Sequence, residues 1–345
     1  MNKSKDVTIY DLARALKMAP STVSRGLNDH PEINKKTKKK ILEMASQMQY
    51  QSNTFASNLR RQCTNTIGVM VPKLNSYFVS TVLAGMEKVA SENGYNLIIS
   101  QSLELMSKEI KNANTMFHNR VDGLLVSLSF DTTDIDHFSD FIKKDIPVIF
   151  FDRVYDHPKC PCIVIDNYKN SYDLTRHLIE QGCKRIAHVT GNQLRNVYKE
   201  RCGGYKRALT DAGYAFNEGL VMISEMNEEA GITTANAILA MPERPDGIFF
   251  ANDITAATAM QVLKQNGIKI PEDIAIAGFN NELITRVVEP NLTTVNYPSY
   301  DMGVIAATNL INHLNGVSEM FTTNKIVLRS ELIIRASSLR KNTEG

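Results

Sequence analysis

The sequence predicts an all-α helix-turn-helix head followed by an α/β body, in which two doubly wound subdomains each contain a parallel sheet. Two short amphipathic segments joined by a tight turn at residues 8–25 predict the head. From residue 66, short β-rich runs alternate with amphipathic helices, a pattern typical of parallel strands with helices on both faces. A chain of 345 residues with 43% hydrophobic content also exceeds what one core usually serves, so we expect two or three domains.

The head begins with TIYDLARALKMAPSTVSR, residues 8–25, whose apolar side chains recur at helical spacing. They are Ile9, Leu12, Ala13 and Leu16 in the first helix, and Val23 and Leu27 in the second. The polar side chains left facing outward are Ser21, Thr22, Ser24 and Arg25. A second helix with such a face is typical of a motif that enters the DNA major groove. An ordinary helical hairpin with a polar solvent face is the alternative.

A third helix is expected after Asn34, whose side chain can cap it. Its apolar face, which would pack on the first two helices, comprises Ile41, Leu42, Ala45 and Met48. The lysine run KKTKKK at residues 35–40 falls in its first turns, where positive charge opposes the helix dipole. Such runs are usually solvated, and contact with phosphate is the alternative.

Charge is distributed unevenly along the chain. Residues 1–62 contain 12 Lys and Arg against 5 Asp and Glu, a net charge of +7. The remaining 283 residues contain 27 against 32, a net charge of −5. A basic head on a mildly acidic body favours a polyanion as the partner of the head.

The order of motifs along the chain resembles the LacI/GalR family of bacterial repressors. TIYDLA and STVSRGLN come first, a helix ending at Tyr50 follows, and NTFASNLRR, TIGVMVP, GFNN at 278–281 and LTTVNYPSYDMG at 292–303 come after it. No single motif is specific, but their order and spacing together are. The resemblance implies a helix-turn-helix DNA-binding domain at residues 1–50, a hinge helix and linker at 51–65, and a ligand-binding and dimerisation domain at 66–340.

The resemblance also implies which head residues contact DNA. Major-groove contact falls on Pro20, Ser21 and Arg25, and contact with phosphates or base edges falls on Thr8, Tyr10, Thr22, Ser24 and Asn28. Arg25 is the best candidate for bidentate recognition of guanine. Two residues depart from the family pattern: Lys17 stands where a turn glycine is usual, and Ala19 where a serine cap is usual. Pro20 suits the first position of a helix and partly compensates for the missing cap.

Residues 51–62, QSNTFASNLRRQ, correspond to the hinge segment of the family, which becomes a short helix when two copies pair on the operator. Leu59 matches the leucine that relatives insert into the minor groove to kink the duplex. Ala56 would allow two hinge helices to approach closely, and Asn53 stands at a possible cap position. A plain linker with one exposed leucine is the alternative.

The body resembles the periplasmic-binding-protein type I fold, in which the chain crosses three times between two halves. The first half would begin with TIGVMVP and a helix from Phe78 to Asn93 stopped by Gly94, and the second series of strands near CIVIDN. TTVNYP would be the third crossing. We expect the N-subdomain at residues 66–162 and 297–324, and the C-subdomain at 163–293 and 325–340.

Ligands of this fold bind in the cleft between the halves, where the carboxyl ends of the strands meet. The resemblance and the strand ends together predict as ligand-binding residues Tyr77, Phe78, Arg153, Arg195, Arg201, Asn252 and Asn280. For Phe78, packing in the core is an equal alternative. For Asn252, capping of the following helix is the structural alternative, and both roles can hold.

The charged residues near the cleft depart from the family pattern in one direction. Asn280, in GFNN, replaces a carboxylate that commonly binds sugar hydroxyls, and Lys73 stands where an acidic residue is common. Together with three candidate arginines, these changes favour an anionic ligand such as a sugar acid or a sugar phosphate. Salt bridges within the protein are the alternative use of those arginines.

These observations predict a ligand-responsive transcriptional regulator, a repressor of carbohydrate metabolism genes that binds a palindromic operator as a homodimer. A soluble sugar-binding receptor is disfavoured by the basic head and the polar start MNKSKD. A dehydrogenase or another enzyme is disfavoured because no glycine-rich phosphate loop follows a predicted strand. We expect a cytoplasmic protein with reduced cysteines, no cofactor, no metal and no membrane contact.

Overall fold

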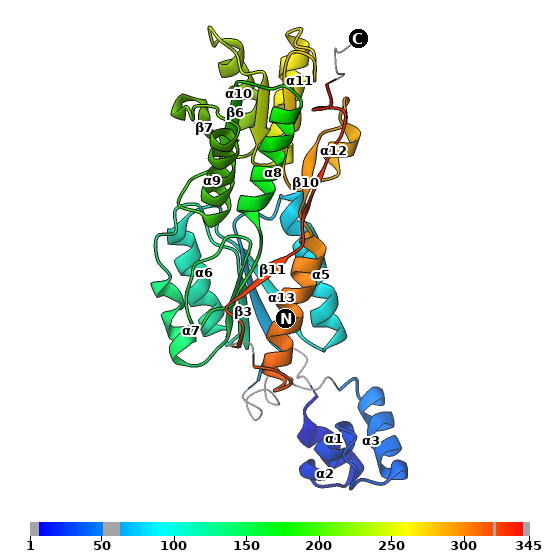
Figure 1. Ribbon diagram of the computed structural model, residues 1–345. Coiled ribbons are helices and arrows are strands. Elements are labelled where there is room, and N and C mark those ends of the chain that lie inside the picture. The colour runs from blue at the N-terminus through cyan, green and yellow to red at the C-terminus, as the bar shows by residue number, and fades with distance from the viewer. Residues whose placement is uncertain (1–6, 51–62, 320–321, 341–345) are drawn as a thin grey trace. The chain divides into compact units, whose positions relative to one another are not determined.

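The computed structural model describes residues 7–50, 63–319 and 322–340 (Figure 1). The chain forms two compact units, Met1–Thr64 and Asn65–Gly345, which are described separately below. The second unit begins at Asn65, one residue before the expected start of the body at residue 66. No helix in the described part of either unit is long and apolar enough to span a bilayer.

The head consists of the helices α1 (Ile9–Leu16), α2 (Pro20–Leu27) and α3 (Lys35–Gln47). They enclose a small core of Leu12, Ala13, Val23, Ile41 and Ala45, all of which we predicted to face inward. The prediction for Leu42 is wrong, because its side chain is 54% exposed. The helix turns Leu42 away from the face that Ile41 and Ala45, four residues apart, share. Gly26 allows α2 to lie close to α3, since a Cβ at this position would overlap the Ile41 side chain.

The caps of these helices follow from local sequence. Thr8 and Asp11 form a capping box, in which the Thr8 N–H donates to the Asp11 carboxylate at 2.9 Å. Asn34 accepts from the Thr37 N–H at 2.8 Å and so caps α3 as predicted. Lys17 ends α1 with φ 53°, a left-handed conformation that glycine would adopt without strain. Ala19 provides no side-chain cap for α2, which begins directly at Pro20.

The first half of the body is a six-stranded parallel sheet with the order β11-β5-β4-β3-β1-β2. The strands are β1 (Thr66–Val71), β2 (Asn96–Gln101), β3 (Gly123–Val126), β4 (Val148–Phe151), β5 (Cys162–Ile165) and β11 (Lys325–Leu328). The helices are α5 (Tyr77–Glu92), α6 (Met106–His118), α7 (Ser139–Lys143), preceded by η1 (Asp136–Phe138), and α13 (Ser299–Leu314). The side chains of β1 alternate between the two faces of the sheet, so that Ile67 and Val69 pack with α5 and α13, whereas Met70 packs with α6 and α7.

The second half is a four-stranded parallel sheet with the order β7-β6-β8-β9. Its strands are β6 (Ile186–Thr190), β7 (Val221–Ile223), β8 (Gly247–Phe250) and β9 (Ala275–Ala277). Its helices are α8 (Asn167–Glu180), α9 (Asn196–Asp211), α10 (Glu228–Leu239), α11 (Asp253–Gln265) and α12 (Ile284–Val287), with η2 (Glu218–Leu220) before β7. A two-stranded antiparallel ribbon of β10 (Thr294–Asn296) and β12 (Glu331–Ile333) runs beside β9.

Two strands belong to a different half from the one predicted. We expected the C-subdomain at residues 163–293 and 325–340, but β5 pairs with β4 and β11 pairs with β5, so both strands belong to the sheet of the first half. The chain therefore enters the second half only at α8. Buried strands of both halves are equally apolar, and hydrophobicity cannot reveal which sheet a strand joins. The third crossing at residues 293–298 and the return of α13 to the first half agree with the prediction.

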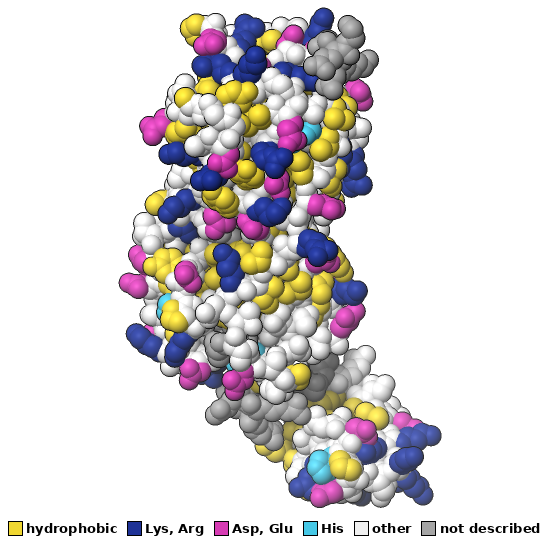
Figure 2. All heavy atoms as spheres, viewed as in Figure 1, with side chains coloured by type: hydrophobic (Ala, Val, Ile, Leu, Met, Phe, Trp, Pro, Cys, Tyr) yellow, Lys and Arg dark blue, Asp and Glu magenta, His cyan; other side chains and the backbone are white. Residues whose placement is uncertain are grey.

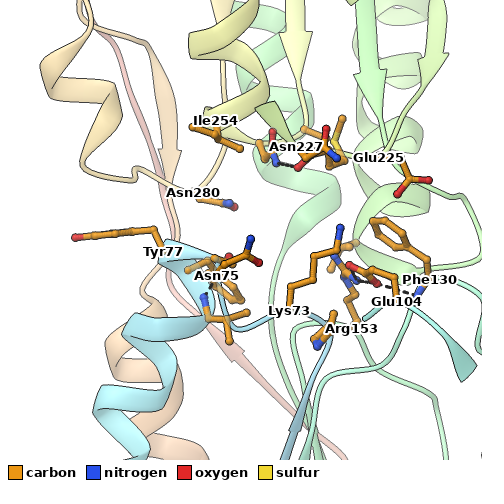
Figure 3. Close-up of a pocket in the computed structure, with 18 of the residues that line it drawn as sticks. Lys73, Asn75, Tyr77, Glu104, Phe130, Arg153, Glu225, Asn227, Ile254 and Asn280 are labelled. Carbon is orange, nitrogen blue, oxygen red and sulfur yellow. Dashed lines mark hydrogen bonds and ion pairs between the residues drawn. The ribbon is translucent and has the colours of Figure 1, made fainter. Parts of the chain in front are cut away.

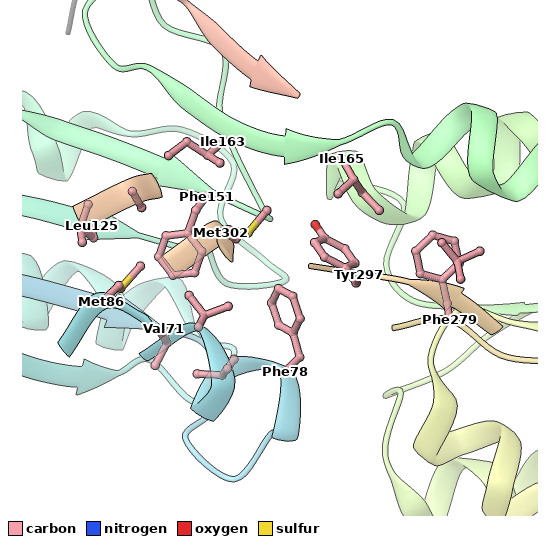
Figure 4. Packing of buried hydrophobic residues seen from close by; sticks show 14 of the residues in the cluster. Val71, Phe78, Met86, Leu125, Phe151, Ile163, Ile165, Phe279, Tyr297 and Met302 are labelled. Atoms are coloured by element: carbon pink, nitrogen blue, oxygen red, sulfur yellow. The ribbon is translucent and has the colours of Figure 1, made fainter. Parts of the chain in front are cut away.

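Aromatic side chains connect the cores of the two halves. The Tyr297 ring lies edge-on to Phe78 of α5, with ring centroids 4.8 Å apart, and it also contacts Phe279, with centroids 6.4 Å apart (Figure 4). The Tyr297 hydroxyl donates to the Asp152 carboxylate at 2.9 Å. The third crossing is thus packed into the core rather than exposed as a loop.

Candidate functional site

A cavity of about 710 Å³ lies between the two halves of the body. The segments that follow β1, β2, β3 and β4 form one wall, and those that follow β6, β7, β8 and β9 form the other (Figure 3). On the first-half wall lie Lys73, Asn75, Tyr77, Phe78, Glu104, Phe130, Asp152 and Arg153. On the second-half wall lie Tyr198, Arg201, Glu225, Asn227, Asn252, Ile254, Asn280 and Glu282. The cavity is thus formed by the carboxyl ends of two parallel sheets that face each other.

Arg153 lines the cavity as predicted, but its charge is already neutralised. Its Nη1 donates to both Glu104 oxygens at 3.0 and 2.8 Å, and its Nη2 donates to the Tyr198 hydroxyl at 3.1 Å. The guanidinium also lies over the Phe130 ring, 4.3 Å from the centroid. Because both members of the ion pair are nearly buried, the pair is part of the wall.

Arg201 is likewise buried and held from several sides. Its Nε donates to Asn167 at 2.9 Å, its Nη1 donates to the Ala251 carbonyl at 2.6 Å, and its guanidinium lies 3.7 Å from the Phe279 ring centroid. Burial lowers the pKa of Arg201 below its usual value. Asp152, beside both arginines, has its pKa raised by burial, although the two positive charges and Tyr297 partly oppose the shift.

Arg195, which we predicted as a ligand-binding residue, is not among the side chains that line the cavity. Arg195 is the N-cap residue of α9, and its buried guanidinium donates from Nη2 to the Thr132 carbonyl in the first half. Its Nε and Nη1 have no hydrogen-bond partner among the residues described. Spacing along GNQLRNVYKER places Arg195 and Arg201 on one helix end, but residues six apart on a helix point in different directions.

The two predicted asparagines lie at the cavity with their amides partly used. Asn252 accepts from the Thr255 N–H at 3.1 Å and donates to the Met226 carbonyl at 2.7 Å, so the capping alternative holds. Asn280 has φ 118°, and its amide nitrogen lies 3.4 Å from Glu282 Oε1. Tyr77 is half exposed at the cavity, and Phe78 both lines the cavity and packs in the core.

Among the charged lining residues, Lys73 differs from the arginines. It forms no hydrogen bond or ion pair with any residue that the structure describes, and it extends from the first-half wall towards the second (Figure 3). The second-half wall opposite carries the exposed carboxylates of Glu225, Glu228 and Glu229. The cavity thus contains more carboxylates than cations.

Sequence reasoning missed several lining residues, among them Asn75, Glu104, Phe130, Asp152, Tyr198, Glu225, Asn227, Ile254 and Glu282. Most lie within five residues after the carboxyl end of a strand. The rule that identified Arg153 and Asn252 would therefore have found them if it had been applied to every predicted strand. The ion pair of Glu104 and Arg153 has no such signal, because these residues are 49 positions apart.

In the head, the predicted DNA-contacting residues lie on and around α2. Pro20, Ser21, Arg25 and Asn28 are exposed, Tyr10 is 67% exposed, and Thr22 and Ser24 are partly exposed. Thr8 is engaged in the cap of α1, and the Asn28 amide donates to the Ser24 carbonyl at 2.8 Å. Arg25 donates to Glu32 at 2.8 Å. The predicted hinge residues Asn53, Ala56 and Leu59 lie outside the residues described.

Two family models match separate parts of the chain. Residues 8–53 match the family of bacterial regulatory proteins named lacI, and residues 175–338 match a periplasmic binding protein-like domain. The transcriptional regulator RegA of Clostridium saccharobutylicum is 32% identical over 334 residues, which cover 96% of this chain and 99% of RegA.

Solved structures of regulators are also similar to this chain. A complex of the transcriptional regulator CelR with cellobiose superimposes with a TM-score of 0.72 at 25% identity, covering 96% of this chain and 99% of CelR. The lac repressor dimer bound to operator superimposes with a TM-score of 0.87 at 21% identity, covering 97% of this chain and all of the repressor chain. The likeness to RegA over nearly the whole of both chains establishes that this chain belongs to the lacI family of bacterial regulatory proteins, which are ligand-responsive, DNA-binding regulators of transcription.

Proposed function

We propose that the protein is a repressor of carbohydrate metabolism genes that binds a palindromic operator as a homodimer. A sugar or sugar acid bound in the cavity controls the affinity of the protein for this operator. The observation that carries the proposal is the cavity itself, because each half supplies one wall. A ligand bound there contacts both halves and biases their relative position. The cellobiose complex of CelR supports a sugar as the ligand.

The head binds DNA through α2. Arg25 reads guanine in the major groove, Pro20 and Ser21 contact neighbouring base edges, and phosphate or base-edge contacts come from Thr8, Tyr10, Thr22, Ser24 and Asn28. The net charge of +7 in residues 1–62 provides the sequence-independent part of the affinity. Leu59 enters the minor groove at the operator centre, with Asn53 and Ala56 supporting the hinge.

The body forms the dimer. Each sheet of the body ends in an edge strand with exposed isoleucines: Ile98 and Ile99 in β2, and Ile223 in β7. Exposed apolar edge strands are usually covered by a partner. A two-fold dimer then requires an inverted-repeat operator.

The effector is a polyhydroxylated molecule, and Lys73 determines whether an acidic group is favoured. Our expectation from the sequence placed an anion between three arginines, but Arg153 pairs with Glu104 and Arg195 lies away from the cavity. Lys73 and Arg201 are therefore the cations that would bind an acidic group, with Asn280 donating beside them. Tyr77 provides an aromatic face for the sugar ring.

Closure of the halves around the effector would rotate the first half within the dimer and change the spacing of the paired hinges. The cavity would then influence operator affinity without touching DNA. Because such coupling is reciprocal, operator DNA must change the affinity for the effector by the same factor.

Isothermal titration calorimetry with glucose, glucuronate and glucosamine tests the effector class, after a thermal-shift screen has identified the sugar skeleton that stabilises the protein. Because Lys73 forms no ion pair with a described residue, we expect the acid to bind more tightly despite the excess of carboxylates in the cavity. Its affinity should fall about tenfold or more in Lys73→Met. Tighter binding of the neutral or amino sugar, unchanged in Lys73→Met, would refute the acidic effector while leaving the regulator assignment intact. Failure of every sugar to bind would refute the carbohydrate effector altogether.

A further inference from the structure

The exposed face of α2 carries an ion pair that reaches into the loop between α2 and α3. Arg25 lies in the last turn of α2, and its Nη1 donates to Glu32 Oε2 at 2.8 Å. Both side chains are more than half exposed. If α2 faces DNA, the phosphates repel the Glu32 carboxylate, which lowers the affinity for DNA.

The loop holds Glu32 beside Arg25 through backbone contacts. The His30 N–H donates to the Arg25 carbonyl at 2.9 Å, and the Ile33 N–H donates to the His30 carbonyl at 3.1 Å. Lys38 of α3 donates to both the carbonyl and the carboxylate of Asp29, at 3.0 and 2.6 Å. These bonds fix the path of the loop, so the loop backbone holds Glu32 close to Arg25.

Glu32 differs from the other carboxylates in the described part of the head. Asp11 belongs to the cap of α1, Asp29 is bound by Lys38, and Glu43 lies 3.9 Å from Lys39 on α3. Lysine and arginine side chains gather on the side of the head that carries α3 (Figure 2). Of the four carboxylates just named, Glu32 is the one that pairs with a proposed base-reading side chain.

We propose that Glu32 is a specificity-determining residue, which orients the Arg25 guanidinium for guanine and opposes its use as a general phosphate contact. The inference rests on the proposed reading of DNA by α2. Glu32 engages Nη1, and the Nε and Nη2 donors on the other side of the planar group have no acceptor among the described residues. That side can donate to guanine O6 and N7 while the carboxylate holds the group.

Two physical effects of Glu32 increase the ratio of specific to non-specific binding. The ion pair restricts the rotamers of a long side chain, so less conformational entropy is lost when guanine is bound. The carboxylate also offsets the charge that Arg25 presents to phosphates, and it is repelled by them on any sequence. Affinity for a non-preferred duplex is therefore lowered more than affinity for the preferred one.

The test uses full-length protein and fluorescence anisotropy with two labelled duplexes. One is the preferred site selected by the wild-type protein from a random-sequence pool, and the other is its scrambled version. In Glu32→Gln we expect affinity for the scrambled duplex to rise about two- to fivefold more than affinity for the preferred duplex. The slope of log affinity against log salt on the scrambled duplex should also steepen by about one.

Glu43→Gln is the matched control, because it removes the same charge from an exposed pair that does not involve Arg25. Glu43→Gln should change the affinity for both duplexes by the same factor. If Glu32→Gln changes the affinity for both duplexes by the same factor, the ratio of the two affinities is unchanged. That result would overturn the inference and leave only a general charge effect. In Arg25→Ala, Glu32→Gln should no longer change the ratio.

Arg25→Ala alone tests the role of Arg25 separately from the role of Glu32. If it abolishes the guanine preference while Glu32→Gln leaves the ratio unchanged, the role of Arg25 stands and that of Glu32 fails. If Arg25→Ala leaves the preferred sequence unchanged, the proposed reading of DNA by Arg25 fails, and the role of Glu32 fails with it.

Discussion

Asp253 is a fully buried residue whose carboxylate forms hydrogen bonds both to a residue of the cavity wall and to the third crossing. Its oxygens accept from the Glu282 N–H at 2.8 Å and from the Thr294 hydroxyl at 2.7 Å. Glu282 lines the cavity, and Thr294 begins β10. Burial raises the pKa of Asp253 to about 7, although the two hydrogen bonds partly oppose the shift.

The raised pKa of Asp253 predicts a pH-dependent stability. Because the folded protein favours the protonated carboxyl, this contribution is complete below about pH 4 and is lost as the pH rises through 7. We expect the free energy of unfolding of the wild type to fall, relative to Asp253→Asn, by up to about 1 kcal/mol per pH unit between these limits. Urea unfolding of both proteins at several pH values measures the difference. Parallel pH profiles for the two proteins would contradict the assignment.

The different positions of Arg195 and Arg201 predict different effects on ligand binding. Arg201→Met should lower affinity for the effector about a hundredfold, because it removes a fixed donor from the cavity wall. Arg195→Met should change affinity far less, since Arg195 bonds Thr132 rather than the cavity. Calorimetry with the effector identified by thermal shift compares the two variants. A larger loss in Arg195→Met would show that the contact between the halves matters more than direct contact.

At the scale of elements, glycines determine how closely the helices pack. A Cβ on Gly303 of α13 would overlap the Val82 backbone of α5, and a Cβ on Gly85 of α5 would overlap the Tyr300 backbone. Gly204 of α9 and Gly231 of α10 lie equally close to the backbones of α8 and α11. Backbone atoms cannot move aside as side chains do, so these contacts require glycine.

Replacing one of these glycines should destabilise the body. We expect Gly303→Val to lower the free energy of unfolding by about 1–3 kcal/mol or more, because the added side chain forces α5 and α13 apart. Chemical denaturation followed by circular dichroism measures it. Gly203→Ala is the control, since its Cβ would meet only the Tyr168 ring and alanine favours the helix. A stable Gly303→Val protein would mean that the helix pair tolerates a wider separation.

At the scale of the whole molecule, the exposed edge strands predict the assembly. Ile99→Asp combined with Ile223→Asp should convert the proposed dimer into a monomer, because each charge would be buried without a partner in the interface. Analytical ultracentrifugation at micromolar concentration measures the change. The monomer should still bind the effector, whose cavity lies within one chain. A double variant that stays dimeric would place the interface elsewhere on the body.

The sequence by itself determined the helical head, the alternation of strands and helices in the body and the family, because these depend on local periodicity, capping residues and the order of motifs. Asn34, Pro20 and the apolar face of α3 are examples, since their roles follow from near neighbours in the chain. The expectation that ligands bind at the carboxyl ends of the strands similarly placed Tyr77, Arg153 and Asn252 at the cavity.

Only the tertiary structure decided which half β5 and β11 join, that Arg195 turns away from the cavity, and that Glu104 neutralises Arg153. Each of these depends on residues far apart in the chain, and nothing in a local pattern indicates which distant group will be the neighbour. The charge that a ligand meets in the cavity is the sum of such pairings. Counting arginines in the sequence therefore overestimated the positive charge of the cavity.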